Sequence, residues 1–242
     1  MELKHDTIER IIREALAQMS AQGIAGAGLS VEAPASNMSV EAPASGKPPQ
    51  RDPFLVSIGV SNRHIHLSRT DMDALFGPGS QLTRKKAMKQ PGQFAAEETV
   101  TLKGRKGSLT KVRVLGPLRK ETQIEVSVAD GFTLGITPPL RMSGHLDDTP
   151  GVEIIGPQGS VTRDRGVIVA LRHIHMPPET AASLGLRNGE EVDVEVGGER
   201  GGVLRKVVVR AAEASAYEMH IDVEEANALC LKNDDLVRIR KI

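Results

Sequence analysis

The first 22 residues carry apolar side chains at the spacing of one helical face. Ile8, Ile12 and Leu16 follow one another at intervals of four, and charged residues such as Arg13 lie elsewhere on the helical wheel. Because residues three or four apart share a face of an α-helix, the pattern predicts an amphipathic helix over 1–22.

The next stretch, 23–53, loses this pattern. It consists mainly of Ala, Gly, Ser and Pro, and it contains SVEAPASNM followed directly by the near copy SVEAPASGK. A segment so poor in large apolar residues cannot bury enough surface to offset its ordering entropy. We therefore expect a disordered linker. The helix is then a tethered segment that docks to a partner or to other copies, or else a piece of the main domain's surface.

From Phe54 onward the chain changes to short runs rich in Val, Ile and Thr, such as TKVRVLG, GVIVALRHIHM and EEVDVEV, separated by Gly, Pro, Asn or Asp. Such runs predict many short strands. We expect a mainly β fold with two related β-barrel subdomains, 54–145 and 146–242, and short helices between strands. The helices are predicted at 69–76, 178–184 and 223–229.

The two predicted subdomains share a motif. A strand leads into Arg-His-Ile-His at 63–66 and again at 172–175, and each copy is followed by a short helix pattern that ends at Gly. A weaker echo is the His-Ile-Asp at 220–222, which also precedes a short helix pattern and a strand. These repeats indicate an internal duplication, with the motifs facing a shared cleft.

The duplicated motif favours metal binding. Residues two apart in a strand point to the same face, so each His-Ile-His places two imidazoles side by side. Imidazole is a common ligand for zinc and similar metals. The chain's seven histidines include five in these strand-end contexts. The five are His64, His66, His173, His175 and His220. Two metals suit this number better than one, and the alternative is a set of surface histidines that titrate with pH. His5 and His145 lie outside these contexts and are expected at the surface.

A carboxylate would complete the ligand set. Glu125 lies between Ile124 and Val126 in an apolar run. A buried carboxylate is costly unless it is paired or bound to a cation, so Glu125 is the candidate. The alternative is a glutamate on an edge strand that faces water.

Composition excludes several classes of function. Lys plus Arg and Asp plus Glu both number 31, so nothing suggests a general binder of nucleic acid. No apolar run is long enough to span a bilayer, and no signal peptide is evident, so we expect a cytoplasmic protein. The single cysteine, Cys230, cannot form an intramolecular disulfide, and its ALCL context predicts a buried small hydrophobic residue.

Six ordered segments carry a resemblance to a known family. They are SNRHIHLS, FAAEETVTLKG, GPLRKETQIEVS, DGFTLGITPPLRMSG, GVIVALRHIHM and EMHID. From about residue 54 to the end, the chain resembles the PduL family of phosphotransacylases, which is found with bacterial microcompartments. The resemblance implies a pair of β-barrels, a site with two Zn²⁺ or other divalent metal ions, and the reversible reaction of acyl-CoA with phosphate to give acyl phosphate and CoA.

The resemblance also implies roles for individual residues. His64, His66 and Glu125 match the ligands of one metal, and His173, His175 and His220 match those of the other. Arg119 matches the family arginine that holds phosphate. The positions that match the family's CoA contacts are Ser61, Lys86, Arg113, Phe132 and Asn227.

The N-terminal helix and linker resemble an encapsulation peptide. This likeness implies a place inside a bacterial microcompartment of propanediol degradation, with shell or core proteins as partners of the helix. We also expect a homo-oligomer, with no nucleic acid or membrane partner.

The chemistry expected is direct attack of phosphate on the thioester, because no serine or cysteine lies in an evident base-activated motif. A first rival is a zinc-dependent thioester or amide hydrolase, because His-x-His pairs with a carboxylate also support water activation. A second rival is a non-catalytic compartment component with structural zinc. The acyl group, propanoyl or acetyl, is open.

Overall fold

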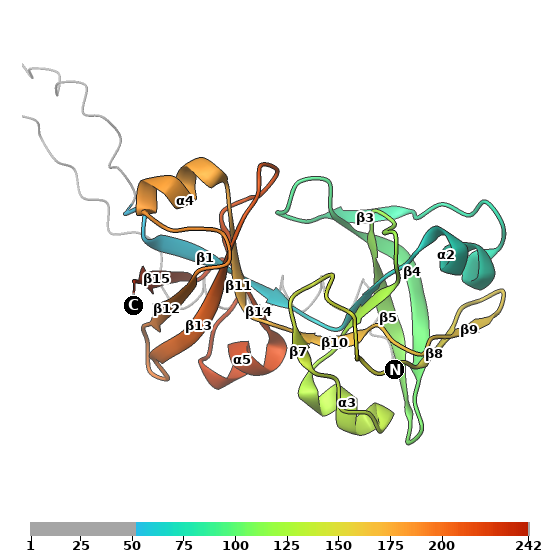
Figure 1. Ribbon diagram of the computed structural model, residues 1–242. Coiled ribbons are helices and arrows are strands. Elements are labelled where there is room, and N and C mark those ends of the chain that lie inside the picture. Colours follow the sequence, from blue (N-terminus) through green and yellow to red (C-terminus); the bar gives the residue numbers. More distant parts are fainter. Residues whose placement is uncertain (1–51, 242) are drawn as a thin grey trace, which may run out of the picture. The chain divides into compact units, whose positions relative to one another are not determined.

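The computed structural model describes residues 52–241, which lie in one compact unit (Figure 1). The predicted helix at 1–22 and nearly all of the predicted linker at 23–53 lie outside the described residues. The described part is mainly β, as expected, with four short helices. None of these helices is long and apolar enough to cross a membrane.

One group of strands forms a closed barrel, called the closed barrel below. Its order is β1-β14-β11-β13-β12-β15. Its interior follows from alternation: along β12 every second residue is a buried valine, and Ile58, Ile174 and Met219 join them in one apolar cluster. The strands are β1 (Leu55–Ser61), β11 (His173–Met176), β12 (Glu191–Val196), β13 (Gly202–Ala211), β14 (Glu218–Asp222) and β15 (Leu236–Arg240).

The other nine described strands form a second sheet, called the open sheet below, around its own apolar cluster. The order is β7-β10-β6-β2-β5-β4-β8-β9, with β3 paired to β4. Its strands are β2 (His64–His66), β3 (Arg84–Ala87), β4 (Phe94–Lys103), β5 (Ser108–Gly116), β6 (Gln123–Glu125), β7 (Leu140–Arg141), β8 (Glu153–Ile155), β9 (Ser160–Thr162) and β10 (Val167–Ala170).

The two sheets are related, as the duplication predicts. In the open sheet β2 runs parallel to β5 and antiparallel to β6, and in the closed barrel β11 runs parallel to β13 and antiparallel to β14. The strands β10 and β1 also correspond, because β10 pairs parallel to β6 and β1 pairs parallel to β14. The closing pair differs, because β1 bonds to β15, whereas β8 bonds to β9 and leaves the sheet open. The open sheet also has two additional strands, β3 on β4 and β7 on β10.

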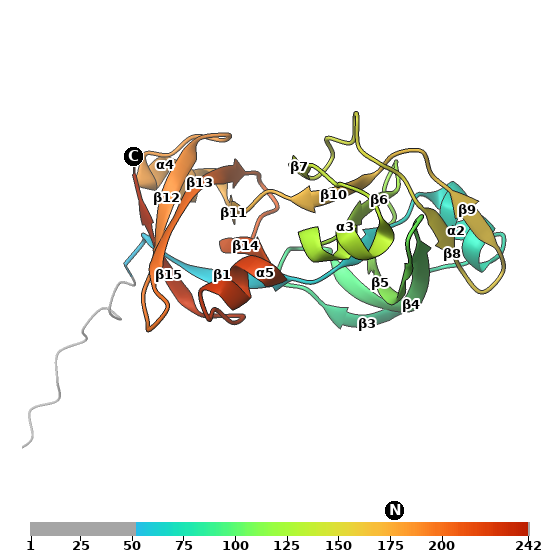
Figure 2. The same ribbon diagram turned by 90° about the horizontal axis from the view of Figure 1, so that it is seen from below.

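The subdomain boundaries predicted at 54–145 and 146–242 do not follow this strand pairing. β1 belongs to the closed barrel, where it lies between β14 and β15, and β8, β9 and β10 belong to the open sheet. The chain therefore crosses between the sheets twice, after β1 and after β10 (Figures 1 and 2). β1 directly precedes the His-Ile-His motif of the open sheet but pairs in the closed barrel, and β10 directly precedes the motif of the closed barrel but pairs in the open sheet. Local sequence patterns do not encode this exchange.

Three helices lie where the sequence places them. They are α2 (Arg69–Phe76), α4 (Pro178–Leu184) and α5 (Val223–Ala228). Helix α3 (Val128–Leu134) is not among the helices predicted from the sequence, because it directly follows the apolar run that contains Glu125. The signal for it is a capping box, in which Ser127 and Asp130 each accept the other's backbone N–H. This box ends β6 directly after Glu125.

Candidate functional site

The structure brings the six predicted metal ligands together as two groups of three. In each group one ligand atom per residue lies within 4.8 Å of the other two. One group lies in the open sheet and the other in the closed barrel. The groups are His64, His66 and Glu125, and His173, His175 and His220.

The first group forms across an antiparallel strand pair. β2 sets His64 and His66 on one face, and β6 places Glu125 directly opposite His64. The Nδ1 of His64 lies 2.8 Å from the carbonyl oxygen of Asn62, so Nδ1 carries the proton and Nε2 is free. That Nε2 lies 3.5 Å from Oε2 of Glu125. The buried Nδ1 of His66 has no hydrogen-bond partner within the part of the chain that the structure describes.

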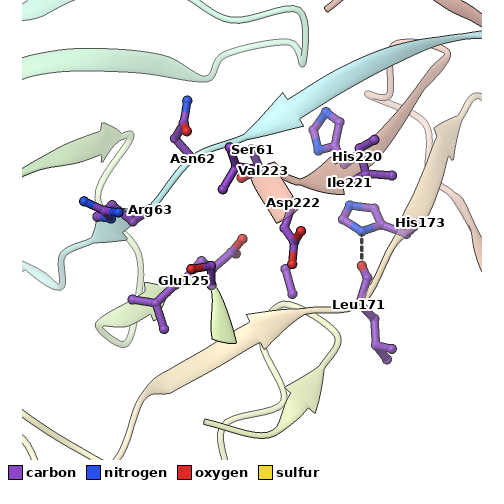
Figure 3. A pocket seen from close by; sticks show the side chains of 13 residues that line it. Ser61, Asn62, Arg63, Glu125, Leu171, His173, His220, Ile221, Asp222 and Val223 are labelled. Atoms are coloured by element: carbon purple, nitrogen blue, oxygen red, sulfur yellow. Dashed lines mark hydrogen bonds between the residues drawn. The ribbon is translucent and has the colours of Figure 1, made fainter. Parts of the chain in front are cut away.

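The second group repeats this geometry. β11 sets His173 and His175 on one face, and β14 places His220 directly opposite His173. The Nδ1 of His173 lies 2.7 Å from the carbonyl oxygen of Leu171 (Figure 3). The Nε2 atoms of His173 and His175 lie 3.0 Å apart. In both groups a carbonyl two residues before the first histidine therefore fixes which ring nitrogen is free.

Burial keeps three of these imidazoles neutral. Loss of water, followed by the charge of neighbouring histidines, lowers the pKa of His175 to about 2 and that of His173 to about 4. Burial likewise holds the pKa of His66 well below its ordinary value, followed by the effects of His64 and Arg119. A neutral imidazole is the form that binds a metal.

The donor set fits two metal ions. Buried ring nitrogens that converge within each group, and one orphaned buried nitrogen on His66, are costly unless a cation binds there. Imidazole and carboxylate ligands suit zinc and neighbouring transition metals, and three protein ligands leave a position for substrate.

Both groups open onto one pocket of about 480 Å³. All six predicted ligands line it, together with Arg119 and Arg210, which supply positive charge. A smaller hollow of about 30 Å³ lies between the sheets, where Glu125 faces His173 and His220 (Figure 3). A concave site with converging polar groups of this size can hold a small or cofactor-sized ligand.

Arg119 reaches the pocket from the segment between β5 and β6. Its guanidinium donates to Ser143 Oγ over 3.0 Å. Burial lowers the pKa of Arg119; the charge of Glu125 raises it and that of Arg210 lowers it again. An arginine still remains protonated under all ordinary conditions, so Arg119 is a fixed cation beside the ligands.

The five residues matched to CoA contacts do not gather in one place. Ser61 and Lys86 line the large pocket. Arg113 instead donates to the carbonyl oxygens of Ala96 and Glu97 on β4. The remaining two lie on neighbouring helices outside both pockets: Phe132, 74% exposed, on α3, and Asn227 on α5. The Glu224 side chain joins these helices by accepting from two backbone N–H groups at the start of α3.

The interpretation of Cys230 as a buried residue is wrong. The side chain is exposed, because the chain turns at Cys230 with a φ of 55° just after α5. His145 is exposed, as expected, and His5 lies outside the described residues.

Several residues that contact the site were missed from the sequence. They are Gln123, Ser143, Arg210 and Glu218. A signal exists for two of them, since Gln123 and Glu218 each stand two residues before a predicted ligand and so share its strand face. Ser143 and Arg210 reach the site through long-range pairing, which no local pattern announces.

Comparisons with known proteins point in one direction. The sequence model of a family described as phosphate propanoyltransferase matches residues 57–232. A phosphate propanoyltransferase of Rhodopseudomonas palustris is 71% identical over 241 residues, which cover 100% of both chains. One of Thermotoga maritima is 50% identical over 78% of this chain and 90% of its own. One of Salmonella typhimurium is 51% identical over 72% of this chain and 82% of its own.

Proposed function

The chain belongs to the phosphate propanoyltransferase family, and we propose that it exchanges CoA for phosphate on a short acyl group, reversibly, at two metal ions held by the six clustered ligands. The family makes it a phosphate acyltransferase. The observation that supports the finer proposal is that both ligand groups and Arg119 line the same pocket.

The ligand sets suggest what the metals contribute. Histidine and carboxylate ligands with an open position favour zinc, and the bound ions would supply Lewis-acid polarisation of the thioester oxygen and an acceptor for sulfur. His64, His66 and Glu125 would hold one ion. The closed barrel's three histidines would hold the other.

Two arginines would hold the phosphate. Arg119 and Arg210 both line the pocket, where burial, and to a smaller extent the charge of Arg210, lowers the pKa of Arg119. A doubly charged phosphate between them would relieve the repulsion between the two charges. The planar fork of each guanidinium matches a pair of phosphate oxygens. Together the two arginines would orient a remaining oxygen toward the thioester. Holding both substrates in one pocket replaces a bimolecular encounter by a unimolecular step.

The reaction balances without an acyl-enzyme. A phosphate oxygen forms the new bond to the acyl carbon, the carbon–sulfur bond breaks, and CoA leaves as the thiolate. Cys230, the chain's single cysteine, does not line the pocket. The Ser143 hydroxyl is engaged by Arg119 and Gln123. Ser61 Oγ lies 3.5 Å from Nδ1 of His64, but that nitrogen carries the proton donated to Asn62 and cannot act as a base. Direct attack by phosphate is therefore the step we propose.

Two residues of the large pocket are proposed to contact CoA. Lys86, at the exposed rim of the pocket on β3, is placed to meet the phosphates of CoA, and Ser61 to meet the part nearest the thioester. Roles for Arg113, Phe132 and Asn227 rest on the family likeness. The acyl group is propanoyl or acetyl, since one methylene in an apolar pocket changes specificity by only about 10- to 200-fold.

The proposal also includes location and assembly. The pattern of 1–22 suggests a helix that takes the chain into a bacterial microcompartment through shell or core proteins, and the chain is proposed to form a homo-oligomer. Sizing the protein with and without residues 1–50 tests whether the helix drives assembly. An unchanged size would remove that role.

Release of free thiol tests the reaction. The full chain is mixed with propanoyl-CoA or acetyl-CoA, with and without phosphate, before and after metal is stripped with a chelator. Release that requires both phosphate and metal supports the proposal and ranks the substrates. Release without phosphate would favour the thioester hydrolase, and no release from metal-loaded protein would favour structural metal.

A further inference from the structure

Each candidate metal group has one more polar residue at an equivalent position. On β6, Gln123 precedes the ligand Glu125 by two residues, and on β14, Glu218 precedes the ligand His220 by two. Gln123 lies opposite His66, and Glu218 lies opposite His175. The internal duplication therefore places Gln123 and Glu218 at the same point in the two halves. Both are buried, with exposed fractions of 1% and 6%.

Each of these residues bonds to the ligand beside it. The Nε2 of Gln123 donates to Oε1 of Glu125 over 2.6 Å. In the other half the direction is reversed, and Nε2 of His220 donates to Oε2 of Glu218 over 2.9 Å. A donor thus holds the carboxylate ligand, and an acceptor holds the imidazole ligand.

We propose that Gln123 and Glu218 are matched positioning residues, each of which orients the third ligand of its own metal site and has the polarity that this ligand requires. The proposal rests on metal binding at the two groups, as in the proposed function, and goes beyond it by assigning roles to two residues outside both ligand sets.

Each bond leaves one ligand atom of its residue free. With Oε1 of Glu125 held by Gln123, its Oε2 is the oxygen that faces Nε2 of His64 at 3.5 Å. With Nε2–H of His220 held by Glu218, the lone pair is on Nδ1, and the carboxylate makes that nitrogen a stronger donor to a cation. Glu218 itself is not one of the three residues whose ligand atoms converge.

Gln123 is fixed by a second set of contacts. The backbone N–H of Gly144 donates to its Oε1 over 2.7 Å, and because that group can only donate, the amide must turn Nε2 toward Glu125. The same Nε2 lies 2.9 Å from Ser143 Oγ, which also accepts from Arg119. Gln123 therefore links the orientation of Glu125 to that of the arginine proposed to hold phosphate.

Glu218 has two further partners in its buried place. Nε2 of Gln90 donates to its Oε2 over 3.4 Å, and Nζ of Lys89 lies 3.4 Å from its Oε1. Gln90 and Lys89 come from the turn between β3 and β4 of the open sheet, so the other half of the protein supplies these partners.

Gly59 leaves the space that Glu218 and His220 occupy. Gly59 pairs with His220 across β1 and β14. A Cβ at this position would lie 2.9 Å from both Oε1 of Glu218 and Cδ2 of His220. The absence of a side chain on the neighbouring strand is thus part of the arrangement that positions His220.

Zinc affinity measured site by site tests the proposal. The full chain is titrated with zinc against a competing chelator, and with Co²⁺, whose visible absorption reports ligand geometry. Glu218→Met should weaken one of the two sites by about 10- to 100-fold and leave the other unchanged, and Gln123→Met should do the same to the other site. Glu218→Gln, which keeps an acceptor but loses the charge, should weaken its site less than Glu218→Met. Glu191→Gln, at the exposed first residue of β12, is the control and should change neither site.

A polarity exchange provides the sharper form of the test. His220→Glu alone puts two carboxylates side by side on β14 and should lose the second zinc site. Adding Glu218→Gln copies the arrangement of the first site. The double variant should bind zinc at the second site at least tenfold more tightly than His220→Glu alone. Equal weakening of both sites by a single variant, no weakening at all, or a double variant no better than His220→Glu would overturn the proposal. The readout is metal affinity and does not depend on the reaction. If single variants weaken single sites but the wild-type protein releases no thiol, the proposed reaction is wrong and the positioning roles stand.

Discussion

Glu125 and His220 occupy the same place in the two halves of this fold. Each lies directly opposite the first histidine of a His-Ile-His motif, Glu125 opposite His64 and His220 opposite His173, and each stands two residues before a helix N-cap. The two candidate metal sites are thus copies of one arrangement in which a carboxylate in one copy replaces an imidazole in the other. The difference gives the two sites different net charge within a single pocket.

Replacing Arg119 by lysine tests its role toward phosphate. Arg119→Lys keeps the charge but loses the two-pronged geometry, so KM for phosphate should rise about 10-fold or more with little change in KM for acyl-CoA. Steady-state kinetics with each substrate varied in turn measure the split. Arg187→Lys, at an exposed position, should leave both constants as they are. An equal rise in both KM values would contradict a specific role in phosphate binding.

The isoleucine within each His-Ile-His motif anchors the strand that carries the histidines. Ile174 is fully buried in the core of the closed barrel, on the face opposite His173 and His175. Ile174→Ala should reduce the free energy of unfolding by about 2–5 kcal/mol through lost burial and a cavity. Urea unfolding followed by circular dichroism measures it. Val203→Ala, at a half-exposed site, should change stability by less than about 0.5 kcal/mol. Similar effects of the two substitutions would contradict this packing.

Gly59→Ala should disturb the second metal site by a steric clash alone. The added methyl group would press on Glu218 and His220, which should cost about 1–3 kcal/mol of stability and weaken zinc binding by the closed barrel's histidines. Gly197→Ala is the matched control, because nothing lies within 4 Å of a Cβ there. Thermal unfolding and zinc titration of the two variants should therefore diverge. Equal behaviour would show that the space beside Gly59 is not needed.

The clustering of the six residues was predictable because their signal is local. A period of two sets paired histidines on one strand face, and Glu125 stood out as a carboxylate in an apolar run; the structure brings all six residues together. The exchange of β1 and β10 between the halves was not predictable, because each pairs with a strand far away in the sequence. Helix α3 had a local signal in its capping box, but the preceding strand pattern hid it.

Cys230 shows how an apolar context can mislead. Its neighbours in ALCL suggest burial, yet the φ of 55° at this residue turns its side chain outward at the end of α5. Ser143 and Arg210 illustrate a second limit, since their place in the pocket depends on the whole tertiary arrangement.

Removing the metals should lower the stability of the folded protein. A ligand that binds only the folded state adds about 4 kcal/mol when its concentration is 1,000 times its Kd, and each of the two sites would contribute separately. Thermal unfolding of the full chain, with zinc and after treatment with a chelator, should therefore show a clear fall in Tm that added zinc reverses. An unchanged Tm would mean that the clustered imidazoles do not bind metal tightly.

The most direct test of two equivalent metal sites is the zinc content of the purified chain and of two single-ligand variants, measured by mass spectrometry of the elements. We expect two zinc ions per wild-type chain and one in each of Glu125→Ala and His220→Ala, with the remaining ion in the untouched half. Fewer than two ions in the wild-type chain, or loss of both ions from either variant, would contradict this expectation.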